Sequence, residues 1–242
     1  MASPLEQFVI KPLVVIGAPD HSWDVSFTNS ALWMVISVAA VYGIFVLGMR
    51  QRAVVPGRLQ SVVELSYEFV AGLIRDNSGK EGMRFFPWIF TLFLFILAGN
   101  MLGLIPGAFT FTSHIIVTFF MAICVWLAVT AVGFYLHGLG FLKFFVPHGA
   151  PPLMYPLLVP IEILSYCVRP VSLSIRLFVN MMAGHTMLKV FAGFIIALGL
   201  FGVFPLAVTV ALYGFEIAVA FLQAYIFTVL TCIYLHDAIH MH

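Results

Sequence analysis

The chain has 242 residues, of which 62% are hydrophobic and only 9% are charged, with a formal net charge of +1. Soluble domains carry about a quarter charged residues, and the near-neutral balance gives no reason to expect a nucleic-acid partner. No Asp, Glu, Lys or Arg occurs between Phe85 and Leu142, whereas about 20 apolar residues suffice for a transmembrane helix. The apolar runs are continuous and do not alternate, which predicts an all-α integral membrane protein.

In chain order, residues 1–28 are predicted to form a polar segment outside the membrane core. Residues 30–49 form a first span, with Ser30 as its plausible N-cap. Residues 58–76 place apolar side chains at helical spacing among charged ones, which predicts an interfacial amphipathic helix; a partner-binding helix is the competing interpretation. Residues 85–136 hold two further spans joined by a short turn at Gly103, Pro106 and Gly107.

Residues 155–238 are predicted to form two long helices, at about 155–190 and 204–236, separated by a bend that contains Gly193, Gly199 and Gly202. The first would be roughly 54 Å long at 1.5 Å per residue, although the hydrocarbon core is only about 30 Å thick. A continuous helix must therefore lie obliquely, unless Pro156, Pro160 or Pro170 breaks it. We expect an oblique hairpin, which makes about five membrane helices and one interfacial helix in a single membrane domain.

Positive charge gathers in residues 50–84, which hold Arg50, Arg52, Arg58, Arg75, Lys80 and Arg84. Lysine and arginine accumulate on the cytoplasmic side of membrane proteins. Five crossings then place the N-terminus outside and the C-terminus in the cytoplasm. Cys124, Cys167 and Cys232 lie within apolar segments, so neither a disulfide nor a metal site is expected from them.

An arginine, Arg176, stands in a long apolar segment that has no acidic residue between Glu162 and Glu216. Such a charge costs between about 3 and more than 10 kcal/mol at mid-bilayer depth, so it is functional by default; pairing to a neighbouring helix is the structural alternative. At about 100° per residue, one polar stripe on the first long helix contains Glu162, Ser165, Arg169, Ser172, Arg176 and Asn180. A second stripe on the last helix contains Glu216, Gln223 and Tyr234.

Titratable groups lie on both sides of Arg176 along the chain, with Glu162 before it and His185 and Glu216 after it. Carboxylates and imidazole exchange protons at accessible pH, whereas an arginine stays charged. The layout is that of two half-paths separated by a fixed cation, although His185 and Glu216 could instead be an ion pair that holds the hairpin closed. His185 lies about 180° from Arg176 on an ideal helix and so faces a different neighbour.

Several polar residues also have a purely structural interpretation. Ser172, Asn180, Gln223 and Tyr234 could be interhelical hydrogen-bonding groups worth about 0.6 kcal/mol each. Asn100 and His114 are expected to make structural hydrogen bonds, and Arg169 to have a structural or interfacial role. Asp237 and three C-terminal histidines could form a metal site, but a solvated end is favoured; these histidines are His236, His240 and His242.

Residues 172–185, Ser-Leu-Ser-Ile-Arg-Leu-Phe-Val-Asn-Met-Met-Ala-Gly-His, resemble the signature of subunit a of the F-type ATP synthases. Residues 100–106 and 160–163 resemble two further family motifs, and 223–227 and 230–235 resemble its final helix. The resemblance covers about residues 25–238. Some bacterial members carry Glu at the position of His185 and His at that of Glu216; this chain has the reverse arrangement, as in mitochondria and their bacterial relatives.

The resemblance implies a proton-translocating subunit in a bacterial plasma membrane, in preference to a mitochondrial inner membrane. Arg176 would face the carboxylate of a rotating c-ring and prevent a proton short circuit. Asn180 and Gln223 would line that interface, Glu162 the cytoplasmic half-channel, and His185 and Glu216 the outer one; Ser172 and Tyr234 complete the candidate proton path. The c-ring and peripheral-stalk b-type subunits are the expected partners.

Rival functions find no sequence support. A stand-alone transporter predicts internal repeats, but no second copy of the arginine stripe occurs. An intramembrane enzyme or a nucleotide-binding protein would need motifs such as Gly-x-Ser-x-Gly, His-Glu-x-x-His or a phosphate-binding loop, which the sequence lacks. We therefore expect no cofactor, no metal and no enzymatic activity from this chain by itself.

Overall fold

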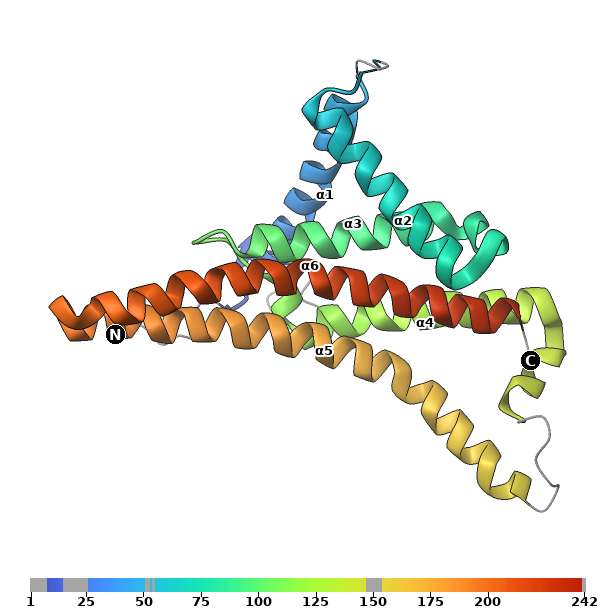
Figure 1. Ribbon diagram of the computed structural model, residues 1–242. Helices are drawn as coiled ribbons and strands as arrows, with labels where there is room; N and C mark the ends of the chain where they lie inside the picture. The colour runs from blue at the N-terminus through green and yellow to red at the C-terminus, as the bar shows by residue number, and fades with distance from the viewer. Residues whose placement is uncertain (1–7, 15–25, 51–52, 54, 147–153, 241–242) are drawn as a thin grey trace. The chain divides into compact units, whose positions relative to one another are not determined.

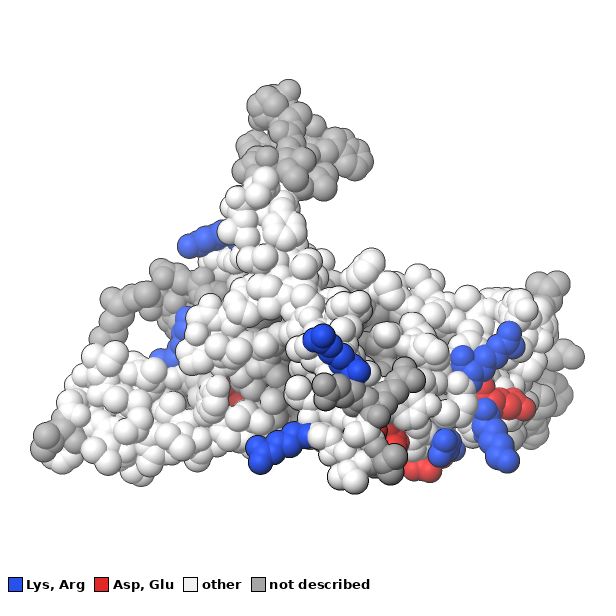
Figure 2. All heavy atoms as spheres, turned by 90° about the horizontal axis from the view of Figure 1, so that it is seen from above, with Lys and Arg blue, Asp and Glu red and all other residues white. Residues whose placement is uncertain are grey.

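The computed structural model describes residues 8–14, 26–50, 53, 55–146 and 154–240. Apart from a two-stranded antiparallel sheet of β1 (Pro12–Val14) and β2 (Phe27–Thr28), the regular elements in these ranges are helices (Figure 1). Five helices in the described chain are long and apolar enough to cross a membrane. Figure 2 shows few charged side chains on the face that it draws. The predicted all-α membrane fold is confirmed.

The first span is α1 (Asn29–Gly48), close to the predicted range. The predicted N-cap is wrong, because the helix begins one residue before Ser30. Thr28 has the extended backbone of an N-cap, and its hydroxyl accepts a hydrogen bond from the Ala31 amide at 3.4 Å.

The amphipathic segment is α2 (Arg58–Gly82), which extends beyond the predicted end at residue 76 and is broken at Gly79, where φ is 68°. One face buries Val70 and Ile74, whereas Glu68 and Arg75 are exposed. This segregation fits an amphipathic helix, and its location at the membrane surface stays a prediction.

The central elements are η2 (Met83–Phe85), α3 (Phe86–Gly103), η3 (Phe111–Ser113), α4 (Ile115–His137) and η4 (Gly138–Phe145). The helices α3 and α4 match the two predicted spans. Several predicted positions lie outside the described residues: most of the N-terminal segment 1–28, Arg52 and His242.

The last elements are α5 (Tyr155–Leu198), η6 (Gly199–Gly202) and α6 (Val203–Ile239). Gly193 lies within α5, so the predicted bend begins too early. Gly199 takes the left-handed backbone, with φ of 54°, and a side chain at Gly202 would lie 2.6 Å from the Ile195 carbonyl oxygen. The turn therefore occurs where glycine is sterically required.

Pro160 and Pro170 lie inside α5 without ending it, so the alternative of a broken helix is wrong. Proline removes the hydrogen bond to the carbonyl four residues before it, which for Pro170 is that of Tyr166. The indole Nε1 of Trp126 donates to this Tyr166 oxygen at 3.2 Å. A side chain of α4 thus replaces the hydrogen bond that Pro170 cannot make.

Contacts divide the chain into two compact units, of which the first comprises residues 1–63, 94–114 and 177–224. Asn100 on α3 is fully buried there and donates to the Ala220 carbonyl of α6 at 3.2 Å, which confirms its structural role. His114 stacks on the ring of Phe109 with centroids 5.2 Å apart. This unit also holds the parts of α5 and α6 that adjoin their turn.

The second unit comprises residues 64–93, 115–176 and 225–242. Hydrogen bonds join its helices in pairs: Thr118 to Ser174 at 3.2 Å, Thr130 to Tyr166 at 2.6 Å, and Ser78 to the Cys232 carbonyl at 2.7 Å. Each of the two units has its own set of interhelical bonds. A single membrane domain over the whole chain stays a prediction.

Candidate functional site

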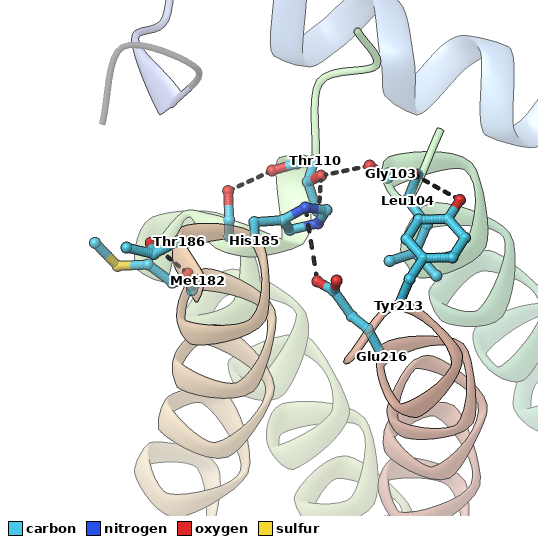
Figure 3. A network of polar contacts seen from close by, with 9 residues as sticks. Gly103, Leu104, Thr110, Met182, His185, Thr186, Tyr213 and Glu216 are labelled. Carbon is cyan, nitrogen blue, oxygen red and sulfur yellow. Dashed lines mark hydrogen bonds and ion pairs between the residues drawn. The ribbon is translucent and has the colours of Figure 1, made fainter. Parts of the chain in front are cut away.

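In the first unit, a histidine of α5 meets a carboxylate of α6. The Nδ1 atom of His185 lies 3.6 Å from Oε1 of Glu216, and their side chains are 11% and 4% exposed. Figure 3 shows the two side chains pointing toward one another from adjacent helices. The structure therefore brings together the two groups that the sequence placed on either side of the glycine-rich bend.

Thr110 holds the other side of the imidazole. Its Oγ1 lies 3.0 Å from Nε2 of His185 and 3.1 Å from the Gly103 carbonyl oxygen (Figure 3). A hydroxyl has one proton to donate, and the carbonyl can only accept it, so Thr110 must accept from Nε2–H. The hydrogen-bond network thus assigns the imidazole proton to Nε2 and leaves Nδ1 to face Glu216.

The carboxylate of Glu216 is buried almost alone. Neither of its oxygens accepts a hydrogen bond from a described residue, and His185 is the one described group at ion-pair distance. An ionised carboxylate without partners is costly in such a place. At 3.6 Å the Nδ1–Oε1 distance is too long for a hydrogen bond. One titratable proton on either group, as imidazolium with carboxylate or as imidazole with carboxylic acid, removes the cost of a lone buried negative charge.

Gly184 makes room for this carboxylate. A Cβ atom at that position would lie 2.6 Å from Oε1 of Glu216 and 2.9 Å from its Cδ. Any side chain there would therefore displace the carboxyl group. Nothing in the sequence indicated Thr110, whereas a glycine in a helix interior, beside the candidate His185, is a signal for close approach that could have pointed to Gly184.

Two adjoining cavities lie near the pair, and the first of them reaches its imidazole. One of about 330 Å³ reaches His185 and Thr110 and is lined further by Thr209 and Tyr213 of α6. The hydroxyl of Tyr213 donates to the Leu104 carbonyl at 3.1 Å, which fixes one wall (Figure 3). The second cavity, of about 400 Å³, shares Gly107, Ala108 and Lys189 with the first. The first cavity gives small polar species access to the imidazole.

Arg176 occupies a different environment, in the second unit. Its side chain is exposed, and no described residue forms a hydrogen bond or ion pair with it. Apolar residues in the same part of α5 are also exposed: Val168 by 48%, Val171 by 38% and Ile175 by 44%. The structural alternative was that Arg176 pairs with a neighbouring helix of this chain. No described residue lies at hydrogen-bond or ion-pair distance from its side chain.

The other predicted site residues are distributed over both units. On α5, Glu162 is half-buried and Ser172 exposed in the second unit, and Asn180 is half-buried in the first; none is hydrogen-bonded to a described residue. Gln223, on α6 in the first unit, is buried with 5% exposed. Tyr234, in the second unit, lies under the Arg169 guanidinium.

Arg169 is structural, as predicted. Its Nη1 forms an ion pair with Asp237 at 3.2 Å, and its Cζ lies 4.9 Å from the centroid of the Tyr234 ring. The guanidinium thus joins α5 to α6 through a charge pair and a cation–π contact. At the end of α6, the rings of His236 and His240 lie 4.5 Å apart, and the described residues contain no group of three or more potential metal ligands.

Comparison with known proteins gives matches over nearly the whole chain. The family model described as ATP synthase A chain matches residues 31–236. ATP synthase subunit a of Rhodospirillum rubrum is 56% identical, with both chains covered fully. The subunit a proteins of Parvibaculum lavamentivorans (56%, covering 98% of this chain and 93% of the relative) and Granulibacter bethesdensis (58%, covering 90% of each) are similar too.

Proposed function

Because the chain belongs to the ATP synthase A chain family, subunit a of the F-type enzymes, we propose that it conducts protons through two offset half-channels to a c-ring. The family makes it a proton-translocating membrane subunit and a non-catalytic part of the synthase. Beyond the family, the proposal assigns residues of this chain to the outer half-channel, to the inner half-channel and to the charge that separates them. The observation that carries it is the buried His185–Glu216 pair at the end of a cavity.

The outer half-channel is assigned to this pair. Water in the cavity of about 330 Å³ can reach the imidazole, and Glu216 lies on its far side. An imidazole changes charge near neutral pH, and one proton satisfies both groups. Loss of that proton inward leaves a buried carboxylate, which favours uptake of the next proton. The pair therefore acts as a relay and not as a permanent ion pair.

Arg176 is assigned as the electrostatic divider. It stays charged at any ordinary pH, and its exposed position among exposed apolar side chains would be costly against lipid. A carboxylate on a partner subunit offsets that cost, and a c-ring is a partner that supplies one at each step of rotation. The fixed charge prevents a proton from passing directly between the two half-channels.

The inner half-channel is assigned to Glu162, Ser172 and Tyr234 of the second unit. Asn180 and Gln223 are assigned to the interface with the c-ring; Gln223 would present only the small part of its side chain that is exposed. Peripheral-stalk b-type subunits are the further partners. The proposed orientation has the N-terminus outside a bacterial plasma membrane and the C-terminus in the cytoplasm, as positive charges in residues 50–84 favour.

The experiment replaces the divider. Arg176→Ala should abolish coupled ATP synthesis in a complex that still assembles, and Arg176→Lys should restore it incompletely, because a desolvated ammonium can lose its proton. Arg75→Ala is the matched control, since Arg75 is an exposed arginine of α2. Assembly is checked on native gels, and synthesis is measured in energised vesicles. Normal coupled synthesis in an assembled Arg176→Ala complex would refute the assignment.

A further inference from the structure

The N-terminal segment Phe8–Val14 contacts the proton relay, although it precedes the residues 31–236 that the family model matches. Asn29, at the start of α1, holds this segment with three hydrogen bonds. Its Oδ1 accepts from the Lys11 amide at 3.1 Å, its Nδ2 donates to the Val9 carbonyl at 3.2 Å, and its own amide donates to the Lys11 carbonyl at 3.1 Å. The Phe8 ring then meets His185 edge-on, with centroids 6.5 Å apart.

The segment brings a second cation to the cavities. Lys11, from the N-terminal segment, and Lys189, from α5, line the same cavity of about 400 Å³, together with Asn29 and Trp33. None of the described residues that line it carries a carboxylate. Lys189 follows His185 by one helical turn and also lines the cavity that reaches the imidazole.

Two lysines at the mouth of a proton path need a physical reason. Positive charges repel hydronium and metal ions alike, so they neither gather protons nor select them from other cations. They do concentrate anions: two ammonium groups that line one cavity raise the local concentration of a monoanion by about three- to tenfold at low ionic strength. The geometry therefore favours an oxyanion in the cavity over a cation.

We propose that Lys11 and Lys189 form an oxyanion-accepting vestibule, which binds a phosphate-type anion beside the His185–Glu216 relay. The inference rests on the proposed function of that relay. A dihydrogen phosphate held there donates its P–OH proton to the relay and leaves as hydrogen phosphate, so no other bond changes. A lipid headgroup phosphate has no such proton and would serve as a fixed counter-charge. Both share the phosphate oxyanion that the lysines recognise.

The test uses the whole synthase in vesicles whose lumen corresponds to the outer side. ATP synthesis is measured at fixed lumenal pH while either lumenal phosphate or imidazole is increased at equal buffering capacity. The variants are Lys11→Gln/Lys189→Gln, the charge-preserving Lys11→Arg/Lys189→Arg, and Lys80→Gln as the control at an exposed lysine of α2. Each is measured in phosphatidylcholine vesicles with and without phosphatidylglycerol, at low and high salt.

For a soluble carrier, the wild-type rate should rise about three- to tenfold more steeply with phosphate than with imidazole, and the difference should fade at high salt. The double variant Lys11→Gln/Lys189→Gln, called the glutamine pair, should lose this preference for phosphate over imidazole. The double variant Lys11→Arg/Lys189→Arg and the control Lys80→Gln should keep it. A lysine effect that appears only with phosphatidylglycerol would identify a lipid headgroup in the same site. Two outcomes would overturn the proposed vestibule. One is a wild-type synthesis rate that rises equally with phosphate and imidazole and does not depend on the lipid. The other is a preference for phosphate that survives in the glutamine pair.

Failure of this inference can be told apart from failure of the relay. His185→Ala and Glu216→Ala should slow proton-driven synthesis in every buffer, because they remove the acceptor and not the anion site. If they slow synthesis while the glutamine pair behaves like wild type, the relay stands and the vestibule is wrong. If both alanine variants conduct like wild type, the proposed function itself is wrong.

Discussion

Replacing Gly184 with alanine should disable the relay without removing either of its titratable groups. The new Cβ would lie 2.6 Å from Oε1, 2.9 Å from Cδ and 3.2 Å from Cγ of Glu216. Ordinary contact begins at 3.4 Å, so the carboxyl oxygen must retreat by about 0.8 Å. The distance from Oε1 to Nδ1 of His185 is already 3.6 Å. Because a misplacement of about 1 Å can cost about 100-fold in rate, we expect proton flux to fall about 10- to 100-fold.

The assay is proton-driven ATP synthesis in vesicles, with the amount of assembled complex measured alongside. Gly193→Ala is the matched control: it lies on the same helix, and a Cβ there meets nothing within 4 Å. Overpacking at Gly184 costs about 1–3 kcal/mol, partly offset by the gain of about 0.5–1 kcal/mol from replacing a helical glycine. Assembly should therefore survive in both variants.

A second substitution makes the reasoning sharper. Combining Gly184→Ala with Glu216→Asp shortens the carboxylate side chain by one methylene and removes the clash. The double variant should therefore conduct more protons than the sum of the two single losses predicts. If Gly184→Ala conducts like wild type, the position of the carboxyl group does not control flux. If the double variant only adds the two losses, steric displacement is not the cause.

Three further results are expected. His185→Glu with Glu216→His should retain part of the flux because both groups are kept, whereas either alanine variant should slow synthesis; a swap slower than both alanine variants would contradict the relay. Burial lowers the pKa of His114 from 6.5 in the folded state, so the unfolded state binds more protons near this pH. The folded state therefore loses stability as pH falls from 6.5 to the lower folded pKa. Thermal unfolding should show that acid lowers the melting temperature of His114→Gln less than that of wild type. Spin labels placed along α5 should differ in membrane depth by about 0.7 Å per residue if its 44 residues cross about 30 Å obliquely. A difference of about 1.5 Å per residue would show an upright helix and contradict the prediction.

Much of the fold was predictable because the membrane constrains it strongly. Continuous apolar runs without charge define α1, α3 and α4, and glycines define the turn after α5. The sequence favoured a continuous α5 but left a break as the alternative, because local rules say that Pro170 breaks a helix. Trp126, which is far away in sequence, donates to the Tyr166 carbonyl that Pro170 leaves without a partner. Such compensation is a tertiary contact and leaves no local pattern.

The candidate site was predictable to the same degree. A charge in an apolar helix stands out, so Arg176, His185 and Glu216 could be found by residue type alone. Thr110 could not, because a threonine in a loop is common and its importance comes from the 3.0 Å contact with Nε2. Lys11 was equally hidden, because tertiary contacts place the N-terminal segment at the cavity: the hydrogen bonds of Asn29 and the pairing of β1 with β2.

Thr110 also determines which protonation states the proposed relay can adopt. Because its single proton goes to the Gly103 carbonyl, His185 keeps a proton on Nε2 whether the ring is neutral or charged. The exchangeable proton of the pair is then the one that either Nδ1 or the Glu216 carboxyl group carries. When that proton leaves, the carboxylate is ionised, buried and without a hydrogen-bond donor among the described residues. This unfavourable state favours uptake of the next proton. In the proposed relay, a carboxylate left without donors favours proton uptake, whereas a permanent ion pair would be stabilised by such donors.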